Sequence, residues 1–207
     1  MKKNLLYIVT LFVVHFAFGQ DKDQVIQTFN AYKSAILENK GTQASELISE
    51  RTKDFYDLMI QHALESDSAT VDDLPFFDKF TVLIMRHSIP KDQLLVMDSK
   101  GFFKYSVEHD YFGKESIIGA KMIEVTVEGN FAQCKMMLNN EEIPYPFNFY
   151  KENDKWQFDL ISLMRVTTGY LVDFINSSDY TVNDFIFEAL FRQNGKPPKP
   201  SIWQPMK

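Results

Sequence analysis

The residues best suited to chemistry are a tyrosine, a histidine and an aspartate, Tyr56, His62 and Asp159. A carboxylate or a neutral imidazole can act as a general base, and a tyrosine hydroxyl can donate a hydrogen bond to a substrate. In an apolar pocket such groups support proton transfer on a small hydrophobic substrate. These three residues are therefore the candidate catalytic residues.

Each candidate also has a structural interpretation. His62 shares the apolar side of its predicted helix, where a single histidine is more often a core residue than a base. Tyr56 and Asp57 are neighbours about 100° apart on a helix, so only one of them can line a pocket. Asp159 lies in an alternating segment and is expected to face solvent, where it would cap a neighbouring element or pair with Arg165.

Other kinds of site lack their usual sequence patterns. His-x-x-x-His, Cys-x-x-Cys, Gly-x-Ser-x-Gly and phosphate-loop patterns are absent from the sequence. The run Glu108-His109-Asp110 spreads around a predicted helix, which favours a solvated polar face over a set of ligands for one metal ion. The sequence therefore predicts neither a metal site nor a cofactor site.

The first twenty residues have the pattern of a secretory signal peptide, since two lysines follow the first methionine and residues 5–18 are almost wholly apolar. Ala17 and Gly19 are small residues at the −3 and −1 positions of a predicted cleavage site. The apolar run is short for a membrane span, and polar residues follow it at once. We expect residues 1–19 to be removed and residues 20–207 to be periplasmic or secreted. The absence of a cysteine after the apolar run predicts no lipid anchor.

Charge and composition limit the partners. The chain has 22 basic and 28 acidic residues, a net charge of −6, which becomes more negative when the two N-terminal lysines are removed. We therefore expect neither nucleic acid nor an anionic membrane surface as a partner. The single Cys134 alternates with Ala132, Met136 and Leu138, which predicts a buried thiol. The 19 phenylalanines predict an aromatic core or an aromatic cavity.

The spacing of apolar residues predicts helices in the N-terminal half. The expected helices span residues 24–38, 44–48, 51–64 and 101–113, with two more after the cap residues 70–73 and from Ser88. An antiparallel meander of four strands follows, because apolar residues alternate between turn signals such as Glu128-Gly129-Asn130. Its last strand is expected over residues 156–162.

Helical spacing resumes after the meander, over residues 166–175 and 182–192. Thr181 and Asp184 have the spacing of a capping box, and Gly195 is a typical end of a helix. The proline-rich segment that follows is predicted to be an extended arm, held by a buried Trp203.

Two stretches carry a resemblance to a known family. The first is Val25-Ile-Gln-Thr-Phe-Asn-Ala-Tyr-Lys-Ser-Ala-Ile-Leu-Glu-Asn39 with Ala44-Ser-Glu-Leu-Ile-Ser49, and the second is Phe147-Asn-Phe-Tyr-Lys-Glu-Asn-Asp-Lys-Trp-Gln-Phe-Asp-Leu160. Both resemble the nuclear transport factor 2-like superfamily, the cystatin-like cone fold, here as an exported bacterial member. The resemblance implies a single α+β domain in which N-terminal helices pack on a curved antiparallel sheet. Its cone-like core would span residues 24–163, and the C-terminal helices and Pro/Trp tail of residues 164–207 would be an extension.

The resemblance also implies a pocket with an apolar wall between the helices and the sheet. Members include ketosteroid isomerase, scytalone dehydratase, polyketide cyclases and non-catalytic binding domains, so the fold alone does not select a function. We favour an exported, non-catalytic binding or accessory domain for an apolar small molecule or a protein partner. The alternative is a cone-fold enzyme of the isomerase, dehydratase or cyclase type that uses Tyr56, His62 or Asp159. A homodimer through the sheet face that carries Met122, Glu124 and Thr126 is a further hypothesis.

Overall fold

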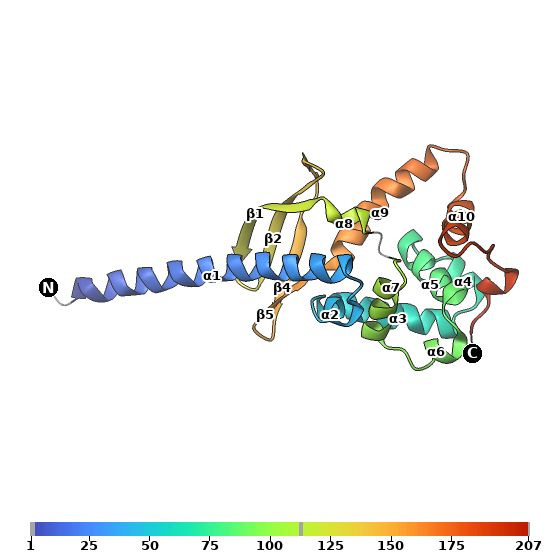
Figure 1. Cartoon of the computed structure of the whole chain (residues 1–207), viewed down its shortest axis with the longest axis horizontal. Helices are drawn as coiled ribbons and strands as arrows, with labels where there is room; N and C mark the ends of the chain where they lie inside the picture. The colour runs from blue at the N-terminus through green and yellow to red at the C-terminus, as the bar shows by residue number, and fades with distance from the viewer. Residues whose placement is uncertain (1–2, 112–113, 207) are drawn as a thin grey trace.

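The computed structural model describes residues 3–111 and 114–206, with side chains for residues 19–111, 114–115 and 117–206. It has the α+β architecture that the sequence predicts, with helices before and after an antiparallel sheet (Figure 1).

The N-terminal half is helical. Its helices are α1 (Lys3–Leu37), α2 (Gly41–Ser45), α3 (Glu50–Glu65), α4 (Ser68–Asp72), α5 (Phe76–Ser88), α6 (Lys91–Leu94), α7 (Ser99–Glu108) and α8 (Glu115–Ile118). The side chains of Ser49, Asp67 and Asp98 accept hydrogen bonds from the backbone at the starts of α3, α4 and α7, which satisfies N–H groups that have no partner within the helix.

The sheet is antiparallel throughout. Its strands are β1 (Ala120–Glu128), β2 (Phe131–Leu138), β3 (Glu141–Glu142), β4 (Phe147–Glu152) and β5 (Lys155–Phe158). Their order is β1-β2-β4-β5, and the short β3 pairs with the end of β2. The turn residues Gly129 and Asn153 have positive φ values of 60° and 49°, which the tight connections between strands require. The meander is therefore confirmed, with β3 as an addition.

The C-terminal part consists of α9 (Leu160–Asn176), α10 (Val182–Asn194) and the 3₁₀ helix η1 (Pro200–Trp203). The predicted capping box of Thr181 and Asp184 is present, and Gly195 ends α10 with a φ of 64°. The tail is held mainly by Ile202, which is buried, whereas Trp203 is only partly buried against Phe187. The prediction of a buried Trp203 is therefore corrected.

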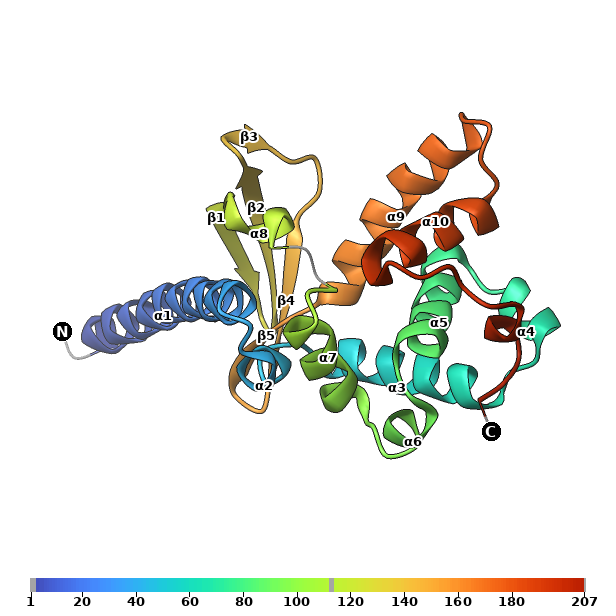
Figure 2. The same cartoon turned by 45° about the vertical axis from the view of Figure 1, so that its right-hand side comes forward.

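Helices α2–α7 form a helical cluster that lies beside the sheet, and α1 crosses the sheet (Figure 1). After β5 the chain turns into α9, which runs diagonally away from the sheet and toward α10 (Figure 2). Helices α3 and α5 pack on α9 from the other side, so α9 connects the sheet to the helical cluster.

Several predicted boundaries are wrong. Strand β5 ends at Phe158, four residues early, and α9 begins at Leu160, six residues before the predicted start. Ser88 ends α5, and the helix predicted from it is α6, which begins three residues later at Lys91. The predicted cap residues 70–73 belong to α4 and its C-cap, and the N-cap of α5 is Pro75. The predicted helix over residues 101–113 ends at Glu108, and its residues 112–113 lie outside the described part of the chain.

The sheet face proposed for a homodimer carries an ion pair between Glu124 and Lys135, whose Oε2 and Nζ atoms are 2.7 Å apart. Met122 on β1 is partly buried and packs against the core, so it contributes little to that face. The homodimer stays a prediction. Among the described residues, no helix combines the length and the apolar character that a membrane span requires.

Candidate functional site

Tyr56 lies in the centre of the helical cluster. Its side chain is 2% exposed, and its ring contacts Phe55, Phe102 and Phe103 at centroid distances of 5.4, 5.1 and 6.1 Å. Burial raises the pKa of Tyr56 above its usual range, so the hydroxyl keeps its proton. The position is that of a core residue.

His62 lies near the end of α3, where its Nδ1 and the Oγ of Ser66 form a hydrogen bond of 2.8 Å. Six residues separate it from Tyr56 along the same helix, a rise of about 9 Å at about 1.5 Å per residue. The two side chains therefore have separate surroundings.

Asp159 is completely buried, which corrects the expectation that it faces solvent. It is the N-cap of α9, because Oδ1 accepts a hydrogen bond from the Ser162 N–H at 3.3 Å and Oδ2 accepts one from the Ser162 hydroxyl. The Nη1 of Arg51 donates to Oδ2 at 3.2 Å. The predicted capping role is present at α9, but the basic partner is Arg51 and not Arg165.

These three candidates do not form one acid–base site. The partner of Asp159 is Arg51, at the start of α3, eleven residues before His62 and therefore about 16 Å away along the helix. A general base has to lie within hydrogen-bond reach of the proton it removes. Tyr56, His62 and Asp159 instead belong to three different sets of contacts.

The structure does contain a cavity of about 390 Å³ between α1, the sheet and the start of α9. Its wall is formed by apolar and aromatic side chains from these elements, from α8 and from the α7–α8 and β3–β4 connections. The lining residues are Tyr32, Ile36, Tyr111, Ile117, Ala120, Met137, Leu138, Ile143, Tyr145, Phe147, Phe158, Leu160, Leu163, Met164 and Thr167. None of the three predicted catalytic residues is among these described lining residues.

Local structure explains how the wall is placed. The Nζ of Lys33 on α1 donates to the carbonyl of Ala120 at 2.8 Å, which holds α1 against the start of β1. On the opposite side, the cap at Asp159 ends β5 and turns the chain into α9 at once. Leu163 and Thr167 are thereby brought to the cavity on one face of α9.

The polar groups of this wall are hydroxyls. Burial raises the pKa of Tyr32 above its usual range and raises the pKa of Tyr111 to about 12. Burial, with a smaller contribution from Tyr170, also raises the pKa of Tyr145. Each phenol therefore stays neutral at physiological pH. The described lining residues include no Asp, Glu, His, Lys or Arg.

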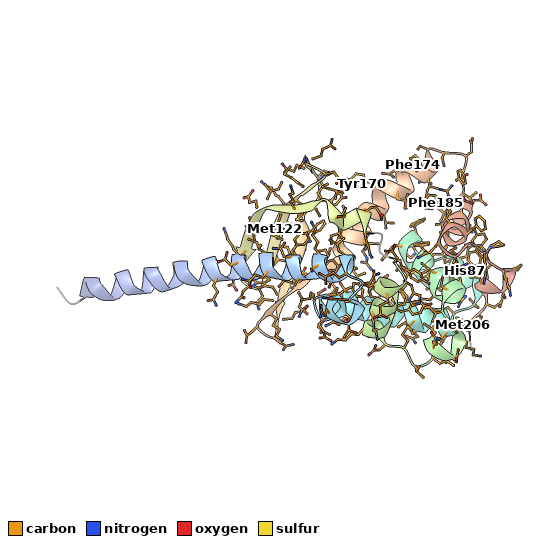
Figure 3. All side chains as sticks on the ribbon, viewed as in Figure 1. His87, Met122, Tyr170, Phe174, Phe185 and Met206 are labelled. Carbon is orange, nitrogen blue, oxygen red and sulfur yellow. The ribbon has the colours of Figure 1, made fainter. Side chains whose placement is uncertain are left out.

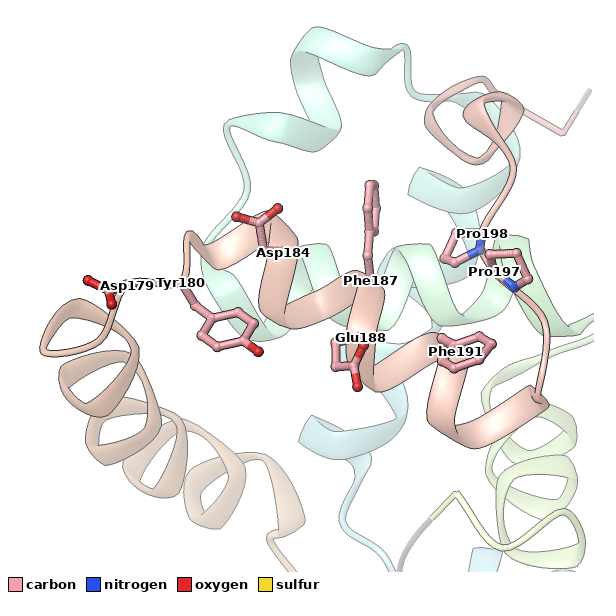
Figure 4. Close-up of a pocket in the computed structure, with 8 residues that line it drawn as sticks. All are labelled: Asp179, Tyr180, Asp184, Phe187, Glu188, Phe191, Pro197 and Pro198. Atoms are coloured by element: carbon pink, nitrogen blue, oxygen red, sulfur yellow. The ribbon is translucent and has the colours of Figure 1, made fainter.

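A second, wider hollow lies on the outer face of α10 (Figure 4). It is lined by Asp179, Tyr180, Asp184, Phe187, Glu188, Phe191, Pro197 and Pro198. Two of its carboxylates already have partners, because Asp184 belongs to the capping box and Glu188 forms an ion pair of 2.7 Å with Arg192. This groove is therefore a weaker candidate than the cavity.

The run Glu108-His109-Asp110 is exposed, and His109 stacks on Tyr105 with a centroid distance of 3.8 Å. Within the described residues there is no group of three or more His, Cys, Asp and Glu side chains that could hold a metal ion.

Sequence reasoning missed the residues at the edge of the cavity. Tyr145 stands between Pro144 and Pro146, and this Pro-Tyr-Pro signal marks a loop that presents an aromatic ring. No comparable signal marks Tyr111, in the connection after α7, or Thr167 on α9, because each reaches the cavity only through the packing of segments far apart in the sequence.

Comparisons with protein-family models, with curated proteins and with solved structures found no match.

Proposed function

We propose that this protein is an exported, non-catalytic binding or accessory domain that holds an apolar small molecule in the cavity between α1, the sheet and α9. The observation that carries the proposal is the cavity itself, about 390 Å³ in volume with an apolar and aromatic wall. Pockets for small molecules typically measure about 300–1,000 Å³ and combine such a wall with a few polar groups.

The polar groups favour binding over proton transfer. An acid–base enzyme needs a base with a pKa near the working pH. The phenols at this wall, Tyr32, Tyr111 and Tyr145, have pKa values raised above the usual range of tyrosine, so they can donate hydrogen bonds but are poor bases at neutral pH. A neutral donor in an apolar wall orients a ligand and leaves its bonds intact.

Export and family are part of the same proposal. The pattern of residues 1–19 supports cleavage of a signal peptide before Gln20. Helices that pack on an antiparallel sheet and leave a cavity between them support membership in the nuclear transport factor 2-like superfamily. The intact mass of the exported protein tests the cleavage, because a chain that begins at Met1 would contradict it.

The experiment is native mass spectrometry of the exported protein, combined with titration of the neutral apolar dye Nile red. We expect a retained small molecule or saturable dye binding. Thr167→Trp should abolish both, because the indole ring would occupy the cavity. The fold should tolerate the change, because Thr167 makes only local hydrogen bonds to the carbonyls of Leu163 and Met164.

Gly169→Trp is the matched control. Gly169 lies on the same helix, and a side chain there meets open space, since nothing lies within 4 Å of its Cβ position. This variant should bind like the wild type. Equal binding by Thr167→Trp and Gly169→Trp, or no saturable binding by the wild type, would show that the cavity is not a ligand site.

A further inference from the structure

One face of α9 continues from the cavity to the surface. Leu163, Thr167, Tyr170 and Phe174 follow each other at spacings of four, three and four residues, which places them on one side of a helix. Leu163 and Thr167 line the cavity. Tyr170 and Phe174 are 57% and 64% exposed. We call these four residues the α9 track.

The cavity and the outer part of the track meet at a pair of tyrosines. Tyr145 lines the cavity, and its ring lies 6.1 Å from the ring of Tyr170. Tyr170 and Phe174 follow each other along α9 as it leaves the sheet (Figure 3). Aromatic side chains therefore follow the cavity at this pair and continue along the same side of α9 to Phe174.

The wall restricts the charge of whatever fills the cavity. The described lining residues carry no ionisable side chain other than tyrosine. Burial of an unpaired charge costs far more than burial of an apolar group. The part of a ligand that lies inside is therefore uncharged, and a charged or strongly polar head group belongs outside.

The length of the α9 track restricts the shape of the ligand. Leu163 and Phe174 are eleven residues apart, which corresponds to about 16 Å along the helix axis. A compact ring system would fill the cavity without contact with Phe174. An extended chain can occupy the cavity and cover the outer track at the same time.

We infer that the ligand of this cavity is a single-chain amphipathic molecule, with its alkyl tail inside, its chain leaving past the Tyr145–Tyr170 pair, and its proximal part on Phe174. The inference rests on the proposed function. It adds the class of the ligand, its direction and the residues that recognise the part outside the cavity.

The test measures the affinity of the exported protein for octanol, decanol, dodecanol and tetradecanol by displacement of Nile red. Each methylene that moves from water into the cavity should raise the affinity by about fourfold, which corresponds to about 0.8 kcal/mol. The increase should continue at a smaller factor per methylene for the longest chains, because the outer track covers only one side of them.

Two substitutions test the exposed half of the α9 track, Tyr170 and Phe174, separately from the cavity. Tyr170→Ser and Phe174→Ser each remove an exposed ring. Both should leave the affinity for octanol unchanged and lower the affinity for tetradecanol by about tenfold. Tyr180→Ser is the matched control, because Tyr180 has the same ring and is 56% exposed but lies outside the track. It should change neither affinity.

The outcomes distinguish the two proposals. If octanol and tetradecanol both bind and the Tyr170→Ser and Phe174→Ser variants bind them like the wild type, the cavity is a ligand site and the extended-chain inference is wrong. An affinity that stops rising beyond decanol would also overturn it. If no alkanol binds and Nile red does not bind either, the proposed function itself fails.

Discussion

Two aromatic regions of this molecule differ in what their rings enclose. In the helical cluster the rings pack directly on one another, with centroids 5.1 to 6.1 Å apart, and they comprise Phe55, Tyr56, Phe77, Phe102 and Phe103. At the sheet, the rings of Tyr32, Tyr111, Tyr145, Phe147 and Phe158 surround a cavity of about 390 Å³. An aromatic composition alone therefore predicts neither a filled core nor a pocket.

The difference lies in the paths of the helices. In the cluster, α2 approaches α7 so closely that a Cβ atom at Gly41 would lie 2.5 Å from the carbonyl oxygen of Lys104. At the sheet, the cap at Asp159 turns the chain into α9, which leaves the sheet diagonally (Figure 2). Close helices expel space between them, and the divergence of α9 from the sheet leaves space that only side chains or a ligand can fill.

The largest expected effect is on the free energy of unfolding, when one residue from each region is replaced by alanine. Phe103→Ala removes a fully buried ring and should lower the free energy of unfolding by about 3–5 kcal/mol. Leu163→Ala removes a partly buried side chain beside an existing cavity and should cost less than about 2 kcal/mol. Urea denaturation measures both. Equal losses would mean that the cavity wall is as tightly packed as the cluster.

The second effect concerns the residue that directs α9. Asp159→Ala removes the N-cap of α9 and the partner of Arg51, and should lower the free energy of unfolding by about 1–2 kcal/mol. It should also weaken binding in the cavity, because Leu163 and Thr167 depend on the start of α9. Asp159→Asn keeps an oxygen that can cap the helix and should restore most of both losses.

Thr181→Ala is the control for Asp159→Ala, because it removes the N-cap of α10 away from the cavity. It should destabilise the protein by about 0.5–2 kcal/mol without a change in ligand affinity. Equal ligand affinity in the Asp159→Ala and Thr181→Ala variants would contradict the role of Asp159 in placing the cavity wall.

Much of the fold could be predicted because its signals are local. The capping box of Thr181 and Asp184, the glycine end of α10 and the alternation around Cys134 each depend on residues a few positions apart. The end of β5 could not be predicted in the same way. Residues 156–162 alternate like a strand, but the side chain of Asp159 caps a helix and interrupts the strand after Phe158.

The sequence predicts that a pocket exists, but it does not predict which residues line it. The phenylalanine content predicts an aromatic core or cavity, and the resemblance implies a pocket between helices and sheet. The lining residues come from distant segments, such as Tyr32, Tyr145 and Thr167, and meet only because α1 and α9 pack on different parts of the sheet. Tyr56, His62 and Asp159 have the chemical types of catalytic residues, but the structure places them in three different sets of contacts.

The third effect uses the buried thiol of Cys134 on β2 as a probe of packing in the core. Burial raises the pKa of Cys134 to about 12, and the usual value for a thiol is 9.0. Between these values the unfolded chain has released the thiol proton while the folded chain retains it. Fewer protons are then bound in the unfolded state, so the free energy of unfolding falls as the pH rises through this window.

At about pH 10 this loss should be about 1.4 kcal/mol, the effect of one pH unit on one proton. Cys134→Ala removes the contribution, so its stability should fall less steeply between about pH 9 and about pH 10. Urea midpoints of the two proteins across this range are the measurement. Parallel curves would mean that the thiol is open to solvent, and that the sheet beneath it is not packed as the structure has it.

The smallest effect is expected from glycine-to-alanine substitutions at two positions. One glycine lies where α2 meets α7, and the other lies on α9 with open space around it. Gly41→Ala should destabilise the protein, because the Lys104 carbonyl oxygen, 2.5 Å from the added Cβ, belongs to the backbone and cannot move aside cheaply. Gly169→Ala should raise the free energy of unfolding by about 0.5–1 kcal/mol, since alanine favours a helix interior and meets no atom within 4 Å there. Thermal unfolding of both variants measures the signs. Opposite signs are what the close contact of α2 with α7 and the solvent-exposed position of Gly169 on α9 require. A Gly41→Ala protein as stable as the wild type would show that α2 and α7 can move apart at little cost.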